Sequence, residues 1–187
     1  MRENISGIIP AVNDFAQLRA FLKSDYGRCV LMHWKLGDLD RVFPALKEKN
    51  RTALIHADLT AGLTADAAGA EYLVHKFSPE GIISTKSAAV TAAKELGVTS
   101  VQRVFLIDSA ALARSEASVA RTAPDYVEFL PAPCPELFPM LSRKFGVPLI
   151  AGGLISSREM AEDLLSRGTV RAVTVSMATL SRNGENI

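Results

Sequence analysis

At residues 149–159 the sequence reads Leu149-Ile150-Ala151-Gly152-Gly153-Leu154-Ile155-Ser156-Ser157-Arg158-Glu159. Three apolar residues, typical of a strand that is buried on both faces, run directly into paired glycines. Ser156 and Glu159 then have the spacing of a helix-capping box, flanked by Ile155 and Met160 as a hydrophobic staple. The stretch therefore predicts one strand–turn–helix unit.

The same alternation of short apolar runs and helical patterns continues through the whole chain. One helical stripe ends at Gly27 and another ends at Gly168. Strands are expected at residues 8–11, 29–33, 53–56, 81–84, 99–105, 126–130, 148–151 and 172–176. These units, with no second zone of composition, predict one domain over residues 1–187, a single compact (β/α)8 TIM-type barrel with parallel strands and short helices.

A doubly wound open sheet is the alternative fold. That fold requires a glycine-rich turn after its first strand, where the backbone approaches a dinucleotide. The turn here reads Pro10-Ala11-Val12-Asn13-Asp14, which contains no glycine. The barrel is therefore the better prediction.

Composition limits the function classes. The 187 residues carry 21 Lys+Arg against 20 Asp+Glu, so a nucleic-acid contact must rest on a local basic patch rather than on bulk charge. No apolar run approaches the ~18 residues that span a membrane, and the first residues lack the apolar core of a signal peptide. Cys29 and Cys134 have no metal-ligand spacing. We expect a cytoplasmic protein that binds no membrane; the sequence is compatible with a homo-oligomer.

The candidate site is expected where the strands of a barrel end. Polar residues of both charge signs, together with two glycines, end or follow the expected strands there. Because an isolated charge would be costly to bury, the convergence of both signs on one face is informative. The positions are His33, Lys35, His56, Asp58, Ser84, Thr85, Lys86, Gln102, Arg103, Glu128, Gly152, Gly153 and Ser176.

A phosphate site is predicted between the turns after the seventh and eighth strands. Gly152 and Gly153 let backbone N–H groups approach an anion, and Ser176 supplies the facing turn. The plainer interpretation is that the glycines only permit a tight turn. Lys86 and Arg103 are permanent cations that could assist, or could form ion pairs with Asp58 or Glu128; both roles are compatible.

His56 and Asp58 are two residues apart on one strand, so their side chains are expected on one face. A histidine and a carboxylate could hold a metal, perform acid–base chemistry, or, with Glu128, bind the hydroxyls of a polyol. No third or fourth ligand has comparable spacing, so no metal is predicted. A structural hydrogen bond is the default. Asp108 is expected to cap the helix after the fifth strand.

Two surface features remain. The proline-rich residues 130–136 predict a stiff loop at the barrel mouth. Arg41, Lys47, Lys49 and Arg51 form a basic cluster on and after the second helix, which is either a solvated face or an RNA contact.

Several segments together resemble the glycerol uptake operon antiterminator regulatory protein family. They read IPAV at residues 9–12, IHADLTAGL at 55–63, GIISTK at 81–86, QRVFLIDS at 102–109, PDYVEFLP at 124–131 and IAGGLI at 150–155. The resemblance covers nearly the whole chain. One departure is that Ala132 and Pro133 stand after Leu130-Pro131, where the family typically has glycine.

The resemblance implies a phosphate-binding barrel that senses glycerol 3-phosphate and then binds an mRNA leader to prevent termination in glycerol-metabolism genes. It implies that Gly152, Gly153 and Ser176 hold the phosphate with help from Lys86 and Arg103. His56, Asp58 and Glu128 would lie near the glycerol hydroxyls. Glycerol 3-phosphate would be the effector, with no cofactor.

Two other functions stay open. One is an enzyme that acts on a small phosphorylated substrate, since the same fold and anion site serve many catalysts. The lack of a complete metal-ligand set, or of a nucleophile with a paired base, favours a regulator over a catalyst. The other is a ligand-binding barrel that regulates through a protein partner.

Overall fold

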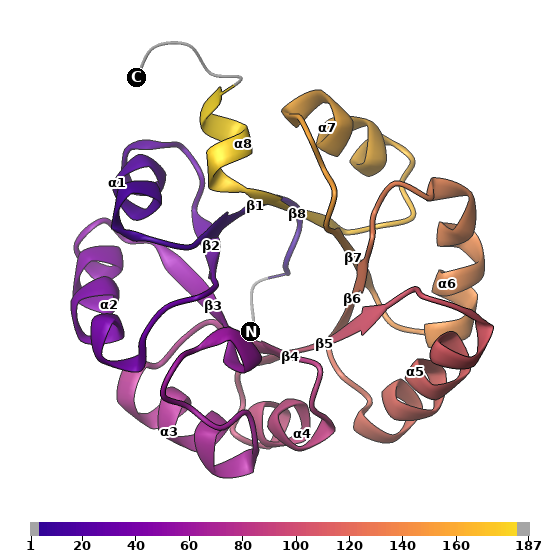
Figure 1. The fold of residues 1–187 in the computed structure, drawn as a ribbon, viewed down its shortest axis with the longest axis horizontal. Coiled ribbons are helices and arrows are strands. Elements are labelled where there is room, and N and C mark those ends of the chain that lie inside the picture. Colours follow the sequence, from indigo (N-terminus) through magenta and orange to yellow (C-terminus); the bar gives the residue numbers. More distant parts are fainter. Residues whose placement is uncertain (1–3, 183–187) are drawn as a thin grey trace.

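The computed structural model describes residues 4–182 as a closed barrel of eight parallel strands surrounded by helices (Figure 1). Each strand pairs with its neighbours in the sequence, and β1 pairs with β8 to close the ring. The predicted (β/α)8 barrel is therefore confirmed. The strands are β1 Gly7–Val12, β2 Arg28–Leu31, β3 Thr52–His56, β4 Gly81–Ser84, β5 Thr99–Phe105, β6 Tyr126–Leu130, β7 Leu149–Gly152 and β8 Ala172–Ser176.

One helix follows each strand and packs on the outside of the ring (Figure 1). Asp14, Asp66 and Asp108 cap three of these helices, each accepting a hydrogen bond from a backbone N–H three residues later. The predicted cap at Asp108 is thus confirmed. The helices are α1 Phe15–Lys23, α2 Leu39–Glu48, α3 Ala67–Phe77, α4 Ser87–Glu95, α5 Ser109–Thr122, α6 Phe138–Phe145, α7 Arg158–Ser166 and α8 Met177–Arg182, with 3-10 turns η1 Leu36–Asp38, η2 Ala57–Leu59 and η3 Pro135–Leu137.

The predicted capping box of α7 is wrong by one residue. Ser157, not Ser156, is the cap, and its Oγ accepts a hydrogen bond from Met160 N at 3.1 Å. Gly153 and Leu154 both have positive φ, 76° and 57°. Two successive left-handed residues lengthen the turn after β7, so the helix begins one residue later than the spacing suggests.

Strand β2 is shorter than the 29–33 expected from its apolar run. It ends at Leu31, and His33 has a φ of 60°. A left-handed residue cannot continue a strand, so His33 belongs to the loop at the barrel mouth.

The barrel interior has an apolar base. Ile5 is buried beneath the strands, and its backbone N donates a hydrogen bond to Tyr126 Oη at 3.0 Å. Around it lies one residue from each strand, namely Ile9, Val30, Leu54, Ile83, Val101, Tyr126, Ile150 and Ala172. Because side chains alternate along a strand, the next interior layer is set two residues further on, toward the C-terminal ends.

Two larger apolar clusters fill the space between the ring and its helices. Near-continuous burial of the strands on both faces explains why they read as uninterrupted apolar runs. None of the helices in residues 4–182 is both long enough and apolar enough to cross a membrane.

Candidate functional site

A polar layer lies directly above the apolar base of the barrel. It contains His56, Arg103, Glu128 and Thr174, each two residues beyond an apolar interior residue of its strand. Strand register aligns Arg103 with Glu128 and Gly152 with Thr174. The alternation of side chains along each strand, which builds the apolar core, thus also places these polar groups inside the barrel, just below its mouth.

Glu128 is held on both of its carboxylate oxygens. Arg103 Nε donates to Oε2 at 2.7 Å, and Thr174 Oγ1 donates to Oε1 at 2.6 Å. Glu128 is 0% exposed and Arg103 is 6% exposed. Two charges buried this deeply require each other, because an unpaired buried ion is costly. The ion pair between Arg103 and Glu128 that the sequence left open is therefore present.

Gly152 is required by this arrangement. A Cβ at this position would lie 2.4 Å from Thr174 Oγ1 and 3.0 Å from Glu128 Oε1. Gly153 differs, since its φ of +76° strains any other residue and a Cβ would lie 3.1 Å from Leu130 Cδ2. The local structure therefore requires glycine at both positions, whether or not an anion binds there.

His56 projects into the same layer and is 2% exposed. Neither ring nitrogen has a hydrogen-bond partner among residues 4–182. Burial, together with the positive charge of Arg103, lowers the pKa of His56 to about 4, although the carboxylates of Glu128 and Asp58 partly oppose this. The ring is therefore neutral near pH 7, with one nitrogen able to donate a hydrogen bond and the other able to accept one.

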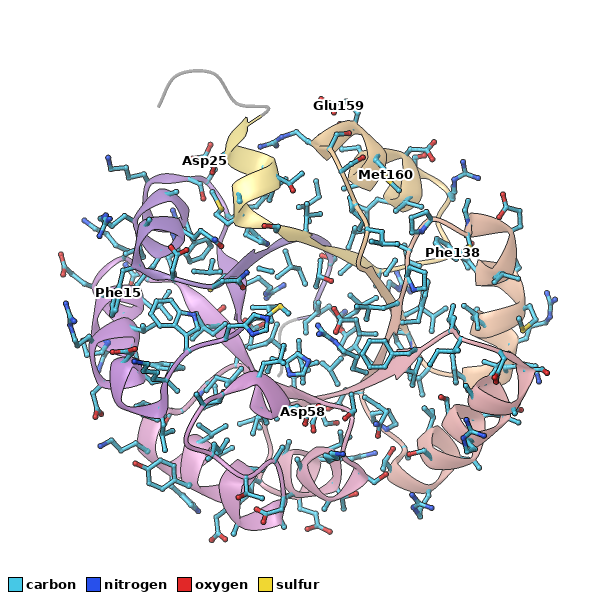
Figure 2. The ribbon with its side chains drawn as sticks, in the orientation of Figure 1. Phe15, Asp25, Asp58, Phe138, Glu159 and Met160 are labelled. Carbon is cyan, nitrogen blue, oxygen red and sulfur yellow. The ribbon has the colours of Figure 1, made fainter. Side chains whose placement is uncertain are left out.

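Asp58 joins two loops at the barrel mouth. Its Oδ1 accepts a hydrogen bond from Ser84 Oγ at 2.5 Å, and its Oδ2 accepts one from Thr85 N at 2.7 Å. Burial would raise the pKa of Asp58, but the hydrogen bonds from Ser84 and Thr85 outweigh it and lower the pKa. Figure 2 shows Asp58 at the inner edge of the ring, on the turn that follows β3.

The remaining predicted ligand residues lie on two sides of the mouth. Gly153 follows β7, and half-buried Ser176 is the last residue of the neighbouring strand β8. Lys86 is exposed and precedes α4, after β4, which lies across the ring from β8 (Figure 1). Lys86 and the two glycines therefore approach the mouth from opposite directions, which the sequence could not reveal.

Two site residues were missed in the sequence. Thr174, two residues before Ser176 on β8, could have been found from strand alternation alone. Asn13 follows β1, and its Oδ1 is buried with no hydrogen-bond partner among the described residues. The only signal for Asn13 was its position just after the first strand.

A hollow of about 260 Å³ lies beside the polar layer, at the end of β5. Thr85, Arg103 and Arg114 contribute to its lining, and Phe105 and Ile107 expose 47% and 79% of their surface there. Within residues 4–182, no three His, Cys, Asp or Glu side chains are grouped as metal ligands.

The four basic residues predicted as a cluster on and after the second helix differ in their contacts. Arg41 lies in the first turn of α2, with its guanidinium 4.6 Å from the centre of the Phe15 ring. Lys47 is six residues further on, about 9 Å along the helix axis. Lys49 Nζ lies 3.9 Å from Glu48 Oε1, and Arg51 Nη2 donates a hydrogen bond to Ser24 O at 2.8 Å.

Comparison with known proteins gives one consistent result. A family model described as glycerol-3-phosphate responsive antiterminator matches residues 8–180, which include almost the whole barrel. The uncharacterized protein YgcP of Escherichia coli (strain K12) is 29% identical over 167 residues, covering 89% of this chain and 87% of that protein.

Two solved structures are similar in sequence as well as in fold. The glycerol uptake operon antiterminator regulatory protein from Listeria monocytogenes is 30% identical with a TM-score of 0.86, over 93% of this chain and 94% of that one. A glycerol uptake operon antiterminator-related protein from Thermotoga maritima is 27% identical with a TM-score of 0.81, over 96% and 99% of the two chains. The resemblance found in the sequence is confirmed: this chain belongs to the glycerol-3-phosphate responsive antiterminator family.

Proposed function

We propose that this protein is a cytoplasmic regulator that binds glycerol 3-phosphate at the mouth of the barrel. In the ligand-bound state it binds the mRNA leader of glycerol-metabolism genes and prevents termination. The family match over residues 8–180 supports glycerol 3-phosphate as the effector. The Listeria and Thermotoga structures, both described by their relation to the glycerol uptake operon, support the regulatory role.

The structural observation that carries the ligand assignment is His56, a buried neutral imidazole whose nitrogens have no partner among the described residues. Leaving such a group unpaired costs roughly 1–3 kcal/mol, which a ligand hydroxyl would recover. Glu128 and Asp58 lie close enough to His56 to influence its pKa. We assign the glycerol hydroxyls to these three residues.

We assign the phosphate to the turns after β7 and β8, through Gly153 and Ser176, with Gly152 shaping the turn. Barrels commonly bind phosphate at this position. Arg103, at 6% exposure, would add a cation from the barrel floor. Lys86, from across the ring, would close over the ligand as a second cation.

Calorimetric titration with glycerol 3-phosphate, glycerol and inorganic phosphate tests the ligand assignment. We expect glycerol 3-phosphate to bind most tightly, since it alone engages both halves of the site. Equal affinity for glycerol and glycerol 3-phosphate would reject the phosphate site. Conversion of glycerol 3-phosphate during the titration would instead support an enzyme.

A further inference from the structure

A second recess lies far from the ligand site. It is a groove of about 1090 Å³ between α2 and α3, here called the α2–α3 groove. Its lining includes Phe43, Lys47, Arg51, Lys76 and Phe77. Thr52 and Thr99, which also line it, are the first residues of β3 and β5, so the groove lies toward the end of the barrel opposite the ligand site. The two helices are neighbours on the outside of the ring (Figure 1).

Two aromatic residues, Phe43 and Phe77, line the α2–α3 groove, and Tyr72 lies next to Phe77. Phe43 and Phe77 stack with their centroids 5.1 Å apart and their planes at 24°. Tyr72 meets Phe77 edge-on at 6.3 Å and is 45% exposed. Phe43 and Phe77 are only partly buried, at the margin of a core cluster. Partly exposed aromatic rings are the platforms on which unpaired bases stack.

The charges of the α2–α3 groove favour an anion. Three cations line it, Lys47, Arg51 and Lys76, against two acids, Asp40 and Glu80. Each acid already forms an ion pair. Asp40 Oδ1 lies 3.0 Å from Lys76 Nζ, and Glu80 Oε1 lies 2.9 Å from Arg28 Nη2.

Lys47 and Arg51 supply the positive charge that these acids do not offset. Lys47 is exposed. The buried Nε of Arg51 has no hydrogen-bond partner among the described residues. In a chain with a net charge of only +1, this is a local positive site.

We propose that the α2–α3 groove binds a single-stranded segment of RNA. Bases stack on Phe43 and Phe77, and backbone phosphates meet Lys47 and Arg51. An acidic peptide would use the cations but not the stacked rings. The inference rests on the proposed function, which makes RNA the partner.

The groove and the ligand site share two strands. β3 begins at the groove with Thr52 and ends at the mouth with His56. β4 runs from Gly81, next to groove residue Glu80, to Ser84, which bonds Asp58. The ligand site and the RNA site thus lie at opposite ends of the same rigid elements.

The test is binding of a fluorescent leader transcript from the glycerol-uptake operon, measured by anisotropy with saturating glycerol 3-phosphate at several salt concentrations. The variants are Lys47→Gln, Phe43→Leu and, as control, Arg143→Gln. Lys47 and Arg143 are both exposed cations in the last turn of a helix, α2 and α6, so both changes cost the same helix-dipole interaction.

Lys47→Gln should reduce the slope of log affinity against log salt by about 0.7, the value of one phosphate contact on single-stranded nucleic acid. Phe43→Leu keeps an apolar side chain but removes the ring, so affinity should fall by about 5- to 150-fold with an unchanged slope. Arg143→Gln should behave as wild type. Melting temperatures check that each variant is folded.

A second readout does not depend on the variants. A leader transcript that contains 4-thiouridine should photo-crosslink in the wild-type protein to peptides from residues 39–53 or 72–80. Crosslinks confined to other peptides, or wild-type affinity in both Lys47→Gln and Phe43→Leu, overturn the groove assignment alone. Failure of the wild-type protein to bind the transcript overturns the proposed function and this inference with it.

Discussion

At the scale of single residues, Glu128 is fixed by contacts from two other strands. Arg103 on β5 and Thr174 on β8 each donate a hydrogen bond to one of its carboxylate oxygens. Gly152 on β7 leaves the space in which the bond from Thr174 is made. A buried charge in this position is stable only while all its partners remain. The polar layer is therefore sensitive to changes as small as one methyl group.

Gly152→Ala should destabilise the protein by about 1–3 kcal/mol, because the new methyl group collides with Thr174 Oγ1. Thr174→Ala removes that atom and leaves Glu128 Oε1 without its donor, at a cost of about 1–3 kcal/mol. The double variant should lose less than the sum of the two, because the collision with Thr174 Oγ1 no longer exists, although the new Cβ still lies 3.0 Å from Glu128 Oε1. Urea unfolding of the four proteins measures this. Fully additive losses would show that the two residues do not share one space.

His56 should make stability depend on pH. Its pKa is about 4 in the folded protein, below the 6.5 of an unperturbed histidine, so the unfolded chain binds more protons between these values. The contribution of His56 to the free energy of unfolding is therefore fully present above about pH 6.5. It is lost as the pH drops toward 4, and the loss is on the order of 3 kcal/mol.

The measurement is the free energy of unfolding of wild type and His56→Gln from pH 7.5 to 4.5. The difference between the two proteins isolates His56. The slope in this window should be smaller in His56→Gln than in wild type. Parallel curves for wild type and His56→Gln would contradict a buried neutral imidazole.

At the scale of elements, the loops at the barrel mouth are tied together in pairs. Asp58, after β3, holds Ser84 and Thr85, after β4. Ala132 N, after β6, donates to Gly153 O, after β7, at 3.2 Å. The proline-rich stretch is therefore anchored at Ala132, which is fully buried. These hydrogen bonds join the loop after β3 to the loop after β4, and the loop after β6 to the loop after β7.

Asp58→Ala removes the acceptor of two hydrogen bonds and should cost about 2 kcal/mol. Opening should be local, so hydrogen exchange at the Thr85 amide should accelerate while amides in β5 remain protected. Asp66→Ala, which removes the cap of α3 instead, is the matched control and should leave Thr85 protected. Unchanged exchange at Thr85 in Asp58→Ala would show that the tie does not order this loop.

The elements differ in how far sequence predicts them. Eight apolar runs predicted eight strands to within two residues, because burial on both faces leaves a pattern that no turn imitates. The N-cap of α7, Ser157, was misplaced by one residue, since spacing does not show that Leu154 is left-handed. The relation of Lys86 to Gly153 was also invisible, because a position around the ring depends on closure of the whole barrel.

At the scale of the whole molecule, the two ends of the barrel differ in polarity. One end is filled by apolar side chains around Ile5, and the other presents a polar floor around Glu128 and His56. The proposed RNA groove lies on the outside, toward the apolar end, between α2 and α3. In this proposal, ligand and RNA do not compete for one surface, and both can be bound at once.

In the proposed function, binding of glycerol 3-phosphate raises the affinity for RNA, so the two sites are thermodynamically linked. If glycerol 3-phosphate raises the affinity for RNA by some factor, RNA must raise the affinity for glycerol 3-phosphate by the same factor. Since the net charge is only +1, affinity for RNA must come from local contacts and should fall as salt is raised. An RNA binder without gating would show the salt dependence but no linkage.

The most direct measurement is therefore the affinity of the purified protein for its operon leader transcript, with and without glycerol 3-phosphate, at two salt concentrations, with the reciprocal titration of glycerol 3-phosphate in the presence and absence of that transcript. We predict tighter RNA binding with the ligand, an equal factor in the reciprocal titration, weaker binding at high salt, and recovery of the ligand unchanged. Identical RNA affinity with and without glycerol 3-phosphate, or turnover of the ligand at an enzymatic rate, would contradict a ligand-gated antiterminator.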